Sequence, residues 1–283
     1  MTNEVQHTHI SAEHKWFQLN LREVFRYRDL IWLFTTRSFT VSYKQTILGP
    51  AWLFINPFIS SVMYTIVFGQ IAKLSTDGIP QILFYLCGNA IWGFFSNSLT
   101  NNSGTFVGNA GLFGKVYFPR LTMPISSMLT GVIRFGIQMI LVLGFLIYYA
   151  IIGAVSPHWW AWILVPFILL HLGLMGMGLG IIISSLTTKY RDLSVLVSFG
   201  MSLWMYGTPV VYPLSQLSGN PVLEKILLIN PVTMPIELFR YAILGVGTFR
   251  AGYFILSIVF TLIVLFFGII IFNRVERTFM DTV

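Results

Sequence analysis

The sequence predicts an all-α polytopic membrane protein with six transmembrane helices, and three observations predict it. Apolar residues make up 55% of the chain, charged residues only 10%, and the mean hydropathy is +0.76. Such a composition is typical of a chain surrounded by lipid. The apolar residues gather in six runs, each with the ~20 residues that a helix needs to cross a bilayer. Polar or basic segments separate these runs.

The six predicted spans cover residues 50–72, 80–100, 122–152, 160–185, 194–213 and 252–273. Pro50 opens the first span, where proline suits the first turn of a helix. The third span is long enough to tilt or protrude. The stretch 214–251 contains Pro221, Pro231 and Pro235 and cannot form one clean span. Two short helices that dip into the membrane and return are expected there.

The chain before the first span divides into a polar tail, residues 1–15, and a segment of mixed character, residues 16–49. Histidines at positions 7, 9 and 14 could suggest a metal site, but no carboxylate or cysteine set completes a ligand shell. A tail without metal is therefore expected. From Trp16 to Phe39 apolar residues alternate with arginines, which predicts an amphipathic helix lying on anionic lipid. A soluble helical hairpin is the alternative.

The distribution of basic residues predicts the orientation. Twelve lysines and arginines lie in the N-terminal segment, the 2–3 and 4–5 loops and the C-terminus, and four lie in the opposite loops. Because cytoplasmic loops are enriched in lysine and arginine, both termini are expected in the cytoplasm. The same bias accounts for the net charge of +7 without nucleic acid as a partner. Cys87, the single cysteine, excludes an internal disulfide and is expected to be a small buried hydrophobe.

The segment from Asn109 to Pro124 lies between two apolar runs and is too short and too polar to span a bilayer. Leu112, Phe113, Val116 and Tyr117 fall at helical spacing, so a short amphipathic helix on the membrane face is predicted. A phosphate loop requires a glycine where Asn109 stands and Ser or Thr where Val116 stands. If ATP drives this protein, another chain must bind it.

The acidic residues bear on how transport could be driven. None of the six predicted spans contains Asp or Glu. Proton- and sodium-driven carriers generally use an intramembrane carboxylate. Arg134 is the only charge within a span, ~18 Å along the third helix at ~1.5 Å per residue. It could meet an anionic substrate, or it could pair with carbonyls and Gln138. A second polar segment, residues 187–193, suits docking onto a soluble partner, although an ordinary turn would look the same.

Several motifs in a fixed order resemble one family. They are YKQTILGPAW at 43–52, KVYFPR at 115–120, YRDL at 190–193, Asn230-Pro231 and ELFR at 237–240. Together with the arginine-rich helix they resemble the membrane subunit of ABC-2 type polysaccharide exporters, such as the O-antigen and teichoic-acid export permeases. The resemblance covers the chain from about Trp16 to its end.

The resemblance implies a homodimer in the bacterial cytoplasmic membrane, bound to two copies of a separate ATPase that holds ATP and magnesium. The substrate would be a glycan on undecaprenyl diphosphate, carried through a channel between the two permeases. Residues 214–251 would form a periplasmic gate, represented by Glu237 and Arg240. Tyr117 and Phe118 would anchor the ATPase contact. The full set expected in that contact is Leu112, Phe113, Lys115, Tyr117, Phe118, Arg120, Tyr190, Arg191 and Asp192.

Two further sets of residues follow from this interpretation. Arg37 and Lys44 lie before the first span, where a diphosphate head group would need cations as it left the leaflet. Sugar C–H faces pack on aromatic rings, so aromatic residues of three spans are expected along the glycan channel. These are Trp52, Phe58, Tyr64, Trp92, Phe95, Trp204 and Tyr206.

Two alternatives remain at this point. A membrane-embedded transferase would need an acid/base or metal constellation, and the ten acidic residues are scattered, with no pair within a span. An ABC-2 exporter of a drug or a smaller lipid shares the six-helix plan, but it usually has a longer loop between the first two spans than the segment from Lys73 to Pro80.

Overall fold

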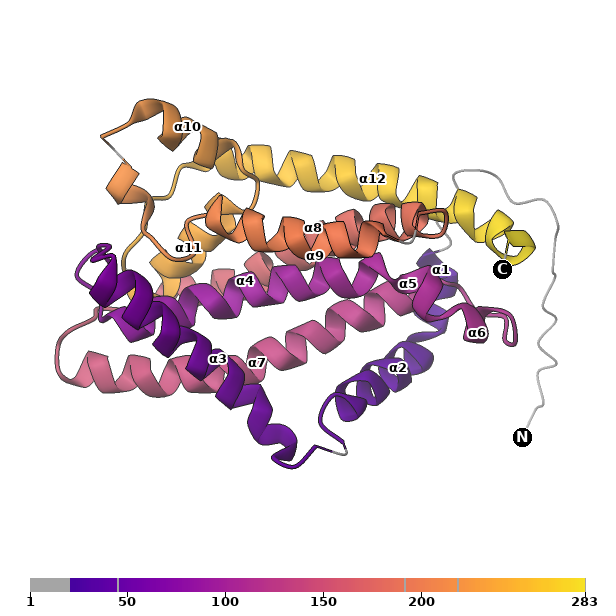
Figure 1. Ribbon diagram of the computed structural model, residues 1–283, viewed down its shortest axis with the longest axis horizontal. Helices are drawn as coiled ribbons and strands as arrows, with labels where there is room; N and C mark the ends of the chain where they lie inside the picture. The colour runs from indigo at the N-terminus through magenta and orange to yellow at the C-terminus, as the bar shows by residue number, and fades with distance from the viewer. Residues whose placement is uncertain (1–20, 45, 191, 218, 283) are drawn as a thin grey trace.

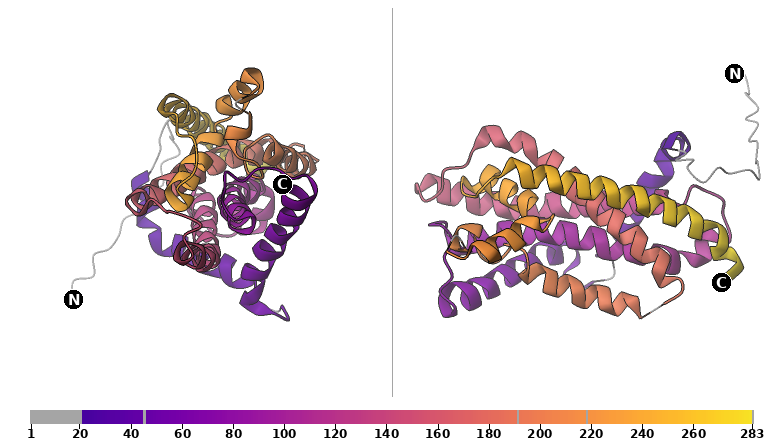
Figure 2. Two further views of the ribbon diagram at one scale, coloured as in Figure 1. Left: turned by 90° about the vertical axis from the view of Figure 1, so that its left-hand side faces the viewer. Right: turned by 90° about the horizontal axis from the view of Figure 1, so that it is seen from above.

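The computed structural model describes residues 21–44, 46–190, 192–217 and 219–282, and this part of the chain is all-helical (Figure 1). The predicted tail and the start of the predicted surface helix lie outside the described residues. Long helices run side by side along one axis in all three views (Figures 1 and 2). The start of α1 and the end of α12 lie at the same end of the bundle.

Six helical segments coincide with the six predicted spans. They are Gly49–Ile71 (η1 Gly49–Ala51, α3 Trp52–Tyr64 and the π-helical η2 Thr65–Ile71), α4 Gln81–Ser103, α7 Thr122–Ile151, Trp159–Thr187 (η3 Trp159–Leu164 and α8 Val165–Thr187), α9 Leu193–Tyr206 and α12 Ala251–Thr282. Four of them are long and apolar enough to cross a membrane: Gly49–Ile71, Thr122–Ile151, Trp159–Thr187 and Ala251–Val275. The apolar sequence of α4 is interrupted by polar residues, although the helix is continuous, and α9 has only 14 residues. The prediction of six spans therefore stays a prediction.

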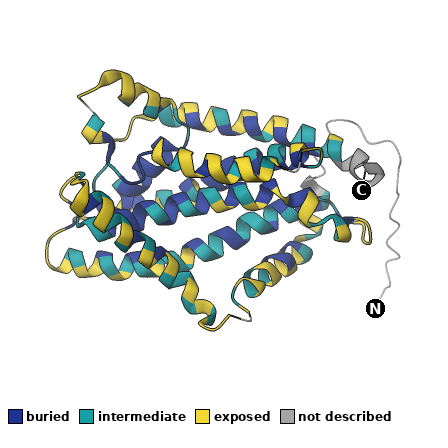
Figure 3. Ribbon diagram, in the orientation of Figure 1, coloured by how far each residue is buried: buried dark blue, intermediate teal, exposed yellow. Residues whose placement is uncertain are grey.

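The centre of the molecule is a layer in which α8 packs closely between α4 and α12. Glycines on α8 permit this contact. An added Cβ at Gly180 would lie 2.5 Å from the Cβ of Asn102 on α4, and one at Gly178 would lie 3.0 Å from Val264 on α12. Small residues at such positions let helix backbones approach one another. The buried surfaces of these helices accordingly face inward (Figure 3).

Helix α2 (Arg28–Val41) packs on α7, and α1 (Leu21–Arg26) adjoins α2 at the same end of the bundle as the end of α12. Thr35 donates a hydrogen bond to the carbonyl of Ser126 at 3.3 Å, and Ile31 and Phe34 are buried. Phe25 and Trp32 remain exposed. In the described part, the predicted surface helix is two helices, because the helix is interrupted at Tyr27. It also has no single apolar face, because α2 has apolar residues on two sides.

The segment between α9 and α12 contains two short helices, α10 (Pro221–Ile229) and α11 (Thr233–Leu244), as predicted. They lie at the end of the bundle opposite α1 (Figure 1). Their packing differs. Every residue of α11 except Tyr241 is buried, against α4, α8 and η3. Leu228 is the only buried residue of α10. Only α11 is thus part of the core.

Candidate functional site

Two short helices follow α4 at the α1 end, α5 (Thr105–Gly108) and α6 (Ala110–Phe113). The predicted amphipathic helix through Tyr117 is wrong, because helical structure ends at Phe113 and a turn follows. Gly111 and Gly114 disfavour continuation of the helix, and Pro119 restricts Phe118 to non-helical backbone. The chain from Lys115 to Phe118 is therefore free to turn back toward the bundle.

Phe118 points into the molecule. Only 4% of it is exposed, and its ring centroid lies 5.6 Å from that of Phe34 on α2 and 5.7 Å from that of Phe113. The expectation that Phe118 faces a partner is wrong, because the turn after Phe113 directs this ring into the apolar cluster below. Tyr117 and Val116 are exposed instead, Tyr117 by 68%. Arg120 lies over the Phe113 ring at 5.3 Å.

The second predicted contact segment lies beside the first. Ser184 Oγ accepts a hydrogen bond from the backbone N–H of Phe106 at 3.0 Å, and Thr187 donates one to the carbonyl of Ser103 at 3.1 Å. Beyond Thr187, Tyr190 and Asp192 are exposed, and Arg191 lies outside the described residues. The end of α8 is therefore joined to the α4–α5 junction, and two sequence-distant segments share one face at the α1 end.

A cavity of about 650 Å³ lies next to the first segment, between α2 and α6. Two cations line it, Arg37 from α2 and Lys115 from the turn after α6. Lys44 does not line the cavity, although it is exposed. Arg37 and Lys115 are 78 positions apart in the sequence, so nothing in their local pattern indicates that they share a cavity. Lys115 is thus a cavity residue that the sequence does not reveal.

A second, polar cavity of about 240 Å³ adjoins the first, since Ser38, Asn109 and Met123 line both. Arg134 of α7 reaches into it. The expected pairing of Arg134 with carbonyls or Gln138 is absent: the side chain makes no hydrogen bond or ion pair with a described residue, and its Nε is buried without a partner. None of the described residues that line either cavity is a carboxylate.

The aromatic residues expected along a channel fall into three groups. Trp92 and Phe95 are buried in the core against Trp204, with ring centroids 6.4 Å and 5.3 Å from it, so their assignment to a channel is wrong. Helix α4 is surrounded by other helices, which buries both rings. Trp204 and Tyr64 are partly buried, and Trp204 Nε1 donates to Asn230 at 3.1 Å. The remaining three, Trp52, Phe58 and Tyr206, are exposed.

Glu237 and Arg240 of α11 form a buried ion pair at 3.2 Å. Arg240 also donates to the carbonyls of Val210 and Tyr212, and its Cζ lies 4.1 Å from the Phe84 ring centroid. Glu237 Oε2 accepts from the backbone N–H of Thr248 at 3.0 Å. The pair thereby joins α4, α11 and the loops on either side of the α10–α11 unit.

This bundle, with several helices suited to a membrane and two polar segments on one face, is the architecture of a multi-pass membrane permease subunit. A model of the ABC-2 type transporter family matches residues 29–244, which is most of the chain. The chain therefore belongs to the ABC-2 type transporter family.

The chain is also similar to curated export permeases of similar length. The chain is 29% identical over 264 residues to the O-antigen export system permease protein RfbA of Klebsiella pneumoniae, covering 89% of this chain and 94% of that protein. A protein of the same description from Myxococcus xanthus is 27% identical over 214 residues, covering 75% of this chain and 79% of its own.

Proposed function

We propose that this chain is the channel-forming subunit of an ATP-driven exporter that moves an undecaprenyl-diphosphate-linked polysaccharide, similar to an O-antigen, across the bacterial cytoplasmic membrane. Two copies of the chain would associate with two copies of a separate ATPase, which would hold ATP and magnesium. The observation that carries the proposal is the shared face at the α1 end, where the end of α8 is joined by hydrogen bonds to the α4–α5 junction, which leads into the 105–120 segment. A single soluble partner could contact both segments at once.

The association of two copies is supported by the exposure of α3 and α9. Within a membrane, polar side chains that face lipid are costly and generally face a cavity or another protein surface. Asn56 on α3 and Gln70 on η2 are exposed, and on α9 the exposed Ser198 and Ser202 lie one turn apart. Met201 is the only buried residue of α9. A second copy that faces these helices across a glycan path would place Trp52, Phe58 and Tyr206 in polar surroundings.

The cavity between α2 and α6 would receive the diphosphate group. Arg37 and Lys115 supply positive charge there without an opposing carboxylate, and charge-assisted hydrogen bonds to phosphate are among the strong ones. Lys44, outside this cavity, would contribute at most by attracting the lipid to the surface. The pair to test is therefore Arg37 and Lys115, each replaced by Gln, with Lys44→Gln as the control.

The decisive experiment deletes the permease gene and analyses the glycans chemically. The proposal requires lipid-linked polysaccharide to accumulate on the cytoplasmic side and to disappear from the surface, with recovery on re-expression. Export of a drug or a smaller lipid would instead leave the surface polysaccharide unchanged. Arg37→Gln with Lys115→Gln should reproduce the accumulation, whereas Lys44→Gln should export at least about half as well as the wild type, as expected for a surface cation.

The ATPase contact is tested by comparing neighbouring aromatic residues. Tyr117→Ala removes an exposed ring and should weaken co-purification of the ATPase while the permease stays as stable as the wild type. Phe118→Ala removes a buried ring and should lower the free energy of unfolding by about 3–5 kcal/mol. Normal ATPase recovery and normal export by Tyr117→Ala would show that this segment is only a connector.

The orientation can be tested with single cysteines in a Cys87→Ser background. Cysteines at the exposed Ser75, between η2 and α4, and the exposed Ser156, between α7 and η3, should react with an impermeant thiol reagent added to intact cells. A cysteine at Gly114, exposed at the α1 end, should react only after permeabilisation. Labelling of the Gly114 position from outside would reverse the proposed orientation.

A further inference from the structure

One face of α7 changes from polar to apolar along its length. Residues seven positions apart in a helix share a face, with a drift of only ~20° per heptad. Ser127, Arg134, Leu141 and Tyr148 form such a series. The first two line the polar cavity described above, and the last two line an apolar groove. Cavity and groove are therefore successive parts of one surface, with Arg134 and Leu141 ~10 Å apart along the axis.

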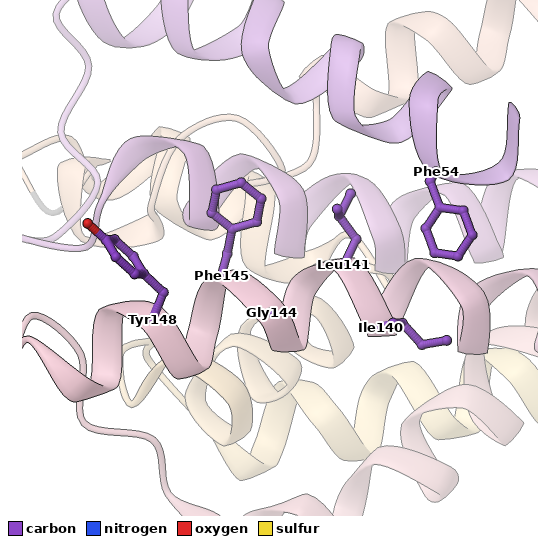
Figure 4. A pocket seen from close by; sticks show the side chains of 6 residues that line it. All are labelled: Phe54, Ile140, Leu141, Gly144, Phe145 and Tyr148. Carbon is purple, nitrogen blue, oxygen red and sulfur yellow. The ribbon is translucent and has the colours of Figure 1, made fainter. Parts of the chain in front are cut away.

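The groove has a volume of about 470 Å³ and lies between α7 and α3 (Figure 4). Phe54 of α3 projects toward α7, and Leu141 and Phe145 of α7 project toward α3. One turn beyond Phe54, Phe58 stacks on Phe145 with ring centroids 6.2 Å apart, so the two helices touch at this point. Gly144 leaves the middle of the groove open, because an added Cβ would meet no atom within 4 Å.

Among the described residues, the polar cavity has no counter-ion. Arg134 has no described partner, and the adjoining cavity adds Arg37 and Lys115, again with no carboxylate among the described residues that line it. Charged groups inside a membrane protein usually pair with an opposite charge or face water or a ligand. The arrangement therefore suits an anion with more than one negative group, attached to a hydrocarbon chain that continues along α7.

We propose that the α7 face from Ser127 to Tyr148 binds the lipid of the transported substrate, with the diphosphate in the two adjoining cavities, between Arg134 and the α2–α6 cavity, and the polyprenyl chain in the groove between α3 and α7. The inference rests on the proposed function and adds a location for the lipid. A diphosphate diester carries a negative charge on each phosphate, which matches three uncompensated cations better than one phosphodiester does. One narrow groove also matches one chain better than the paired chains of a phospholipid.

The direction of the face agrees with this occupant. In the proposed orientation, the polar cavity lies toward the cytoplasmic end of α7 and the groove lies farther from it. A lipid of the inner leaflet has its head group and chain in the same order. The substrate could therefore enter this site from the leaflet without turning over, and its diphosphate would lie between Arg134 and the cavity lined by Arg37 and Lys115.

The experiment uses the purified permease–ATPase complex in phosphatidylcholine nanodiscs, with undecaprenyl diphosphate as the probe. Gly144→Trp fills the groove, and Arg134→Gln removes the cation. Gly136→Trp is the matched control, because Gly136 is also an exposed glycine of α7 with nothing within 4 Å of an added Cβ, but it does not line the groove. Each of the first two should weaken binding about tenfold, or ~1.4 kcal/mol, and the control should bind like the wild type.

A photoreactive residue at Ile140, which lines the groove and is exposed, supplies the second measurement. In cells it should cross-link to lipid-linked glycan. Cross-linking of two permease copies at this position would show that a second copy covers the groove. Displacement of the probe by an equal amount of phosphatidylglycerol would show a site for bulk lipid. Wild-type affinity in Gly144→Trp would overturn the site itself. If the deletion strain still accumulates lipid-linked glycan in these cases, the proposed function stands without this site.

Discussion

Arg240 on α11 and Arg134 on α7 both place a guanidinium group inside the helical bundle, but their surroundings differ. Arg240 is 1% exposed and contacts a carboxylate, two carbonyls and the face of Phe84. Arg134 is half-buried beside a polar cavity and has no partner among the described residues. The two arginines therefore differ in burial, but burial does not say whether a charge is compensated. The presence or absence of a counter-ion does.

The difference has an energetic reason. A buried charge is tolerated when it is paired and hydrogen-bonded, and removal of one partner leaves the other uncompensated. Arg240 meets that condition within its own chain, so its replacement should affect folding. Arg134 does not, so its charge remains available to an anion. The following variants test the contrast in order of expected effect on stability.

Glu237→Leu should have the largest effect, because it leaves the Arg240 guanidinium buried without its carboxylate. Breaking a buried pair in this way typically lowers the free energy of unfolding by about 3–5 kcal/mol. Unfolding of the purified permease in mixed micelles measures the change. The double variant Glu237→Leu, Arg240→Met removes both charges and should recover most of the loss. A double variant no more stable than the single one would mean that Arg240 stabilises through its carbonyl contacts instead.

Gly88→Ala should have an intermediate effect. An added Cβ would lie 2.6 Å from the carbonyl oxygen of Val210 and 3.1 Å from Nη2 of Arg240, so the carbonyl that binds Arg240 would have to move. Such overpacking typically costs about 1–3 kcal/mol. Gly93→Ala on the same helix meets nothing within 4 Å and should be neutral or stabilising, as alanine favours helix. Equal destabilisation by both would point to a general sensitivity of α4.

Arg134→Gln should have the smallest effect on stability, within about 1 kcal/mol, because no partner loses its counter-charge. Its effect should be on transport, measured as polysaccharide at the surface of cells with wild-type amounts of permease. Arg134→Lys keeps the positive charge and should retain part of the transport. A loss of stability as large as that of Glu237→Leu would place Arg134 in the same structural class as Arg240 and remove the basis for a ligand there.

The sequence predicted approximately where the six helical segments lie, because apolar runs of sufficient length have few alternatives, although only four of them are long and apolar enough to cross a membrane. It also predicted two short helices between α9 and α12, because the prolines there exclude one continuous helix. Prediction from the sequence failed for features that depend on tertiary packing, namely where one short helix ends and which aromatic side chains are buried. The 112–117 spacing suits a helix, but the glycines and the burial of Phe118 end it early. Trp92 and Phe95 could have faced lipid, a channel or the core, and only the packing of α4 decides among these.

The site residues show the same limit. Arg134 could be identified from the sequence as the only charge within a predicted span, whereas its missing partner is a property of three helices together. Lys115 and Arg37 line the same cavity only because α2 packs on α7 and the chain turns after Phe113. No periodicity or spacing in the sequence contains that information. Apart from Phe118, Trp92 and Phe95, which are buried in the core, the roles of the predicted contact, channel and gate residues remain predictions.

The glycine contacts between α8 and its neighbours also determine how movement can pass through the molecule. At Gly180 and Gly176, α4 and α8 touch so closely that an added Cβ would lie 2.5 Å and 2.9 Å from α4 atoms. Because α4 and α8 are in such close contact, neither helix can bend without moving the other, and we expect α4 to move as one rigid helix. One end of α4 continues into α5 and α6, and Phe84 and Gly88 near its other end touch Arg240. We therefore expect a push at the α5 end of α4 to be passed along α4 toward α11.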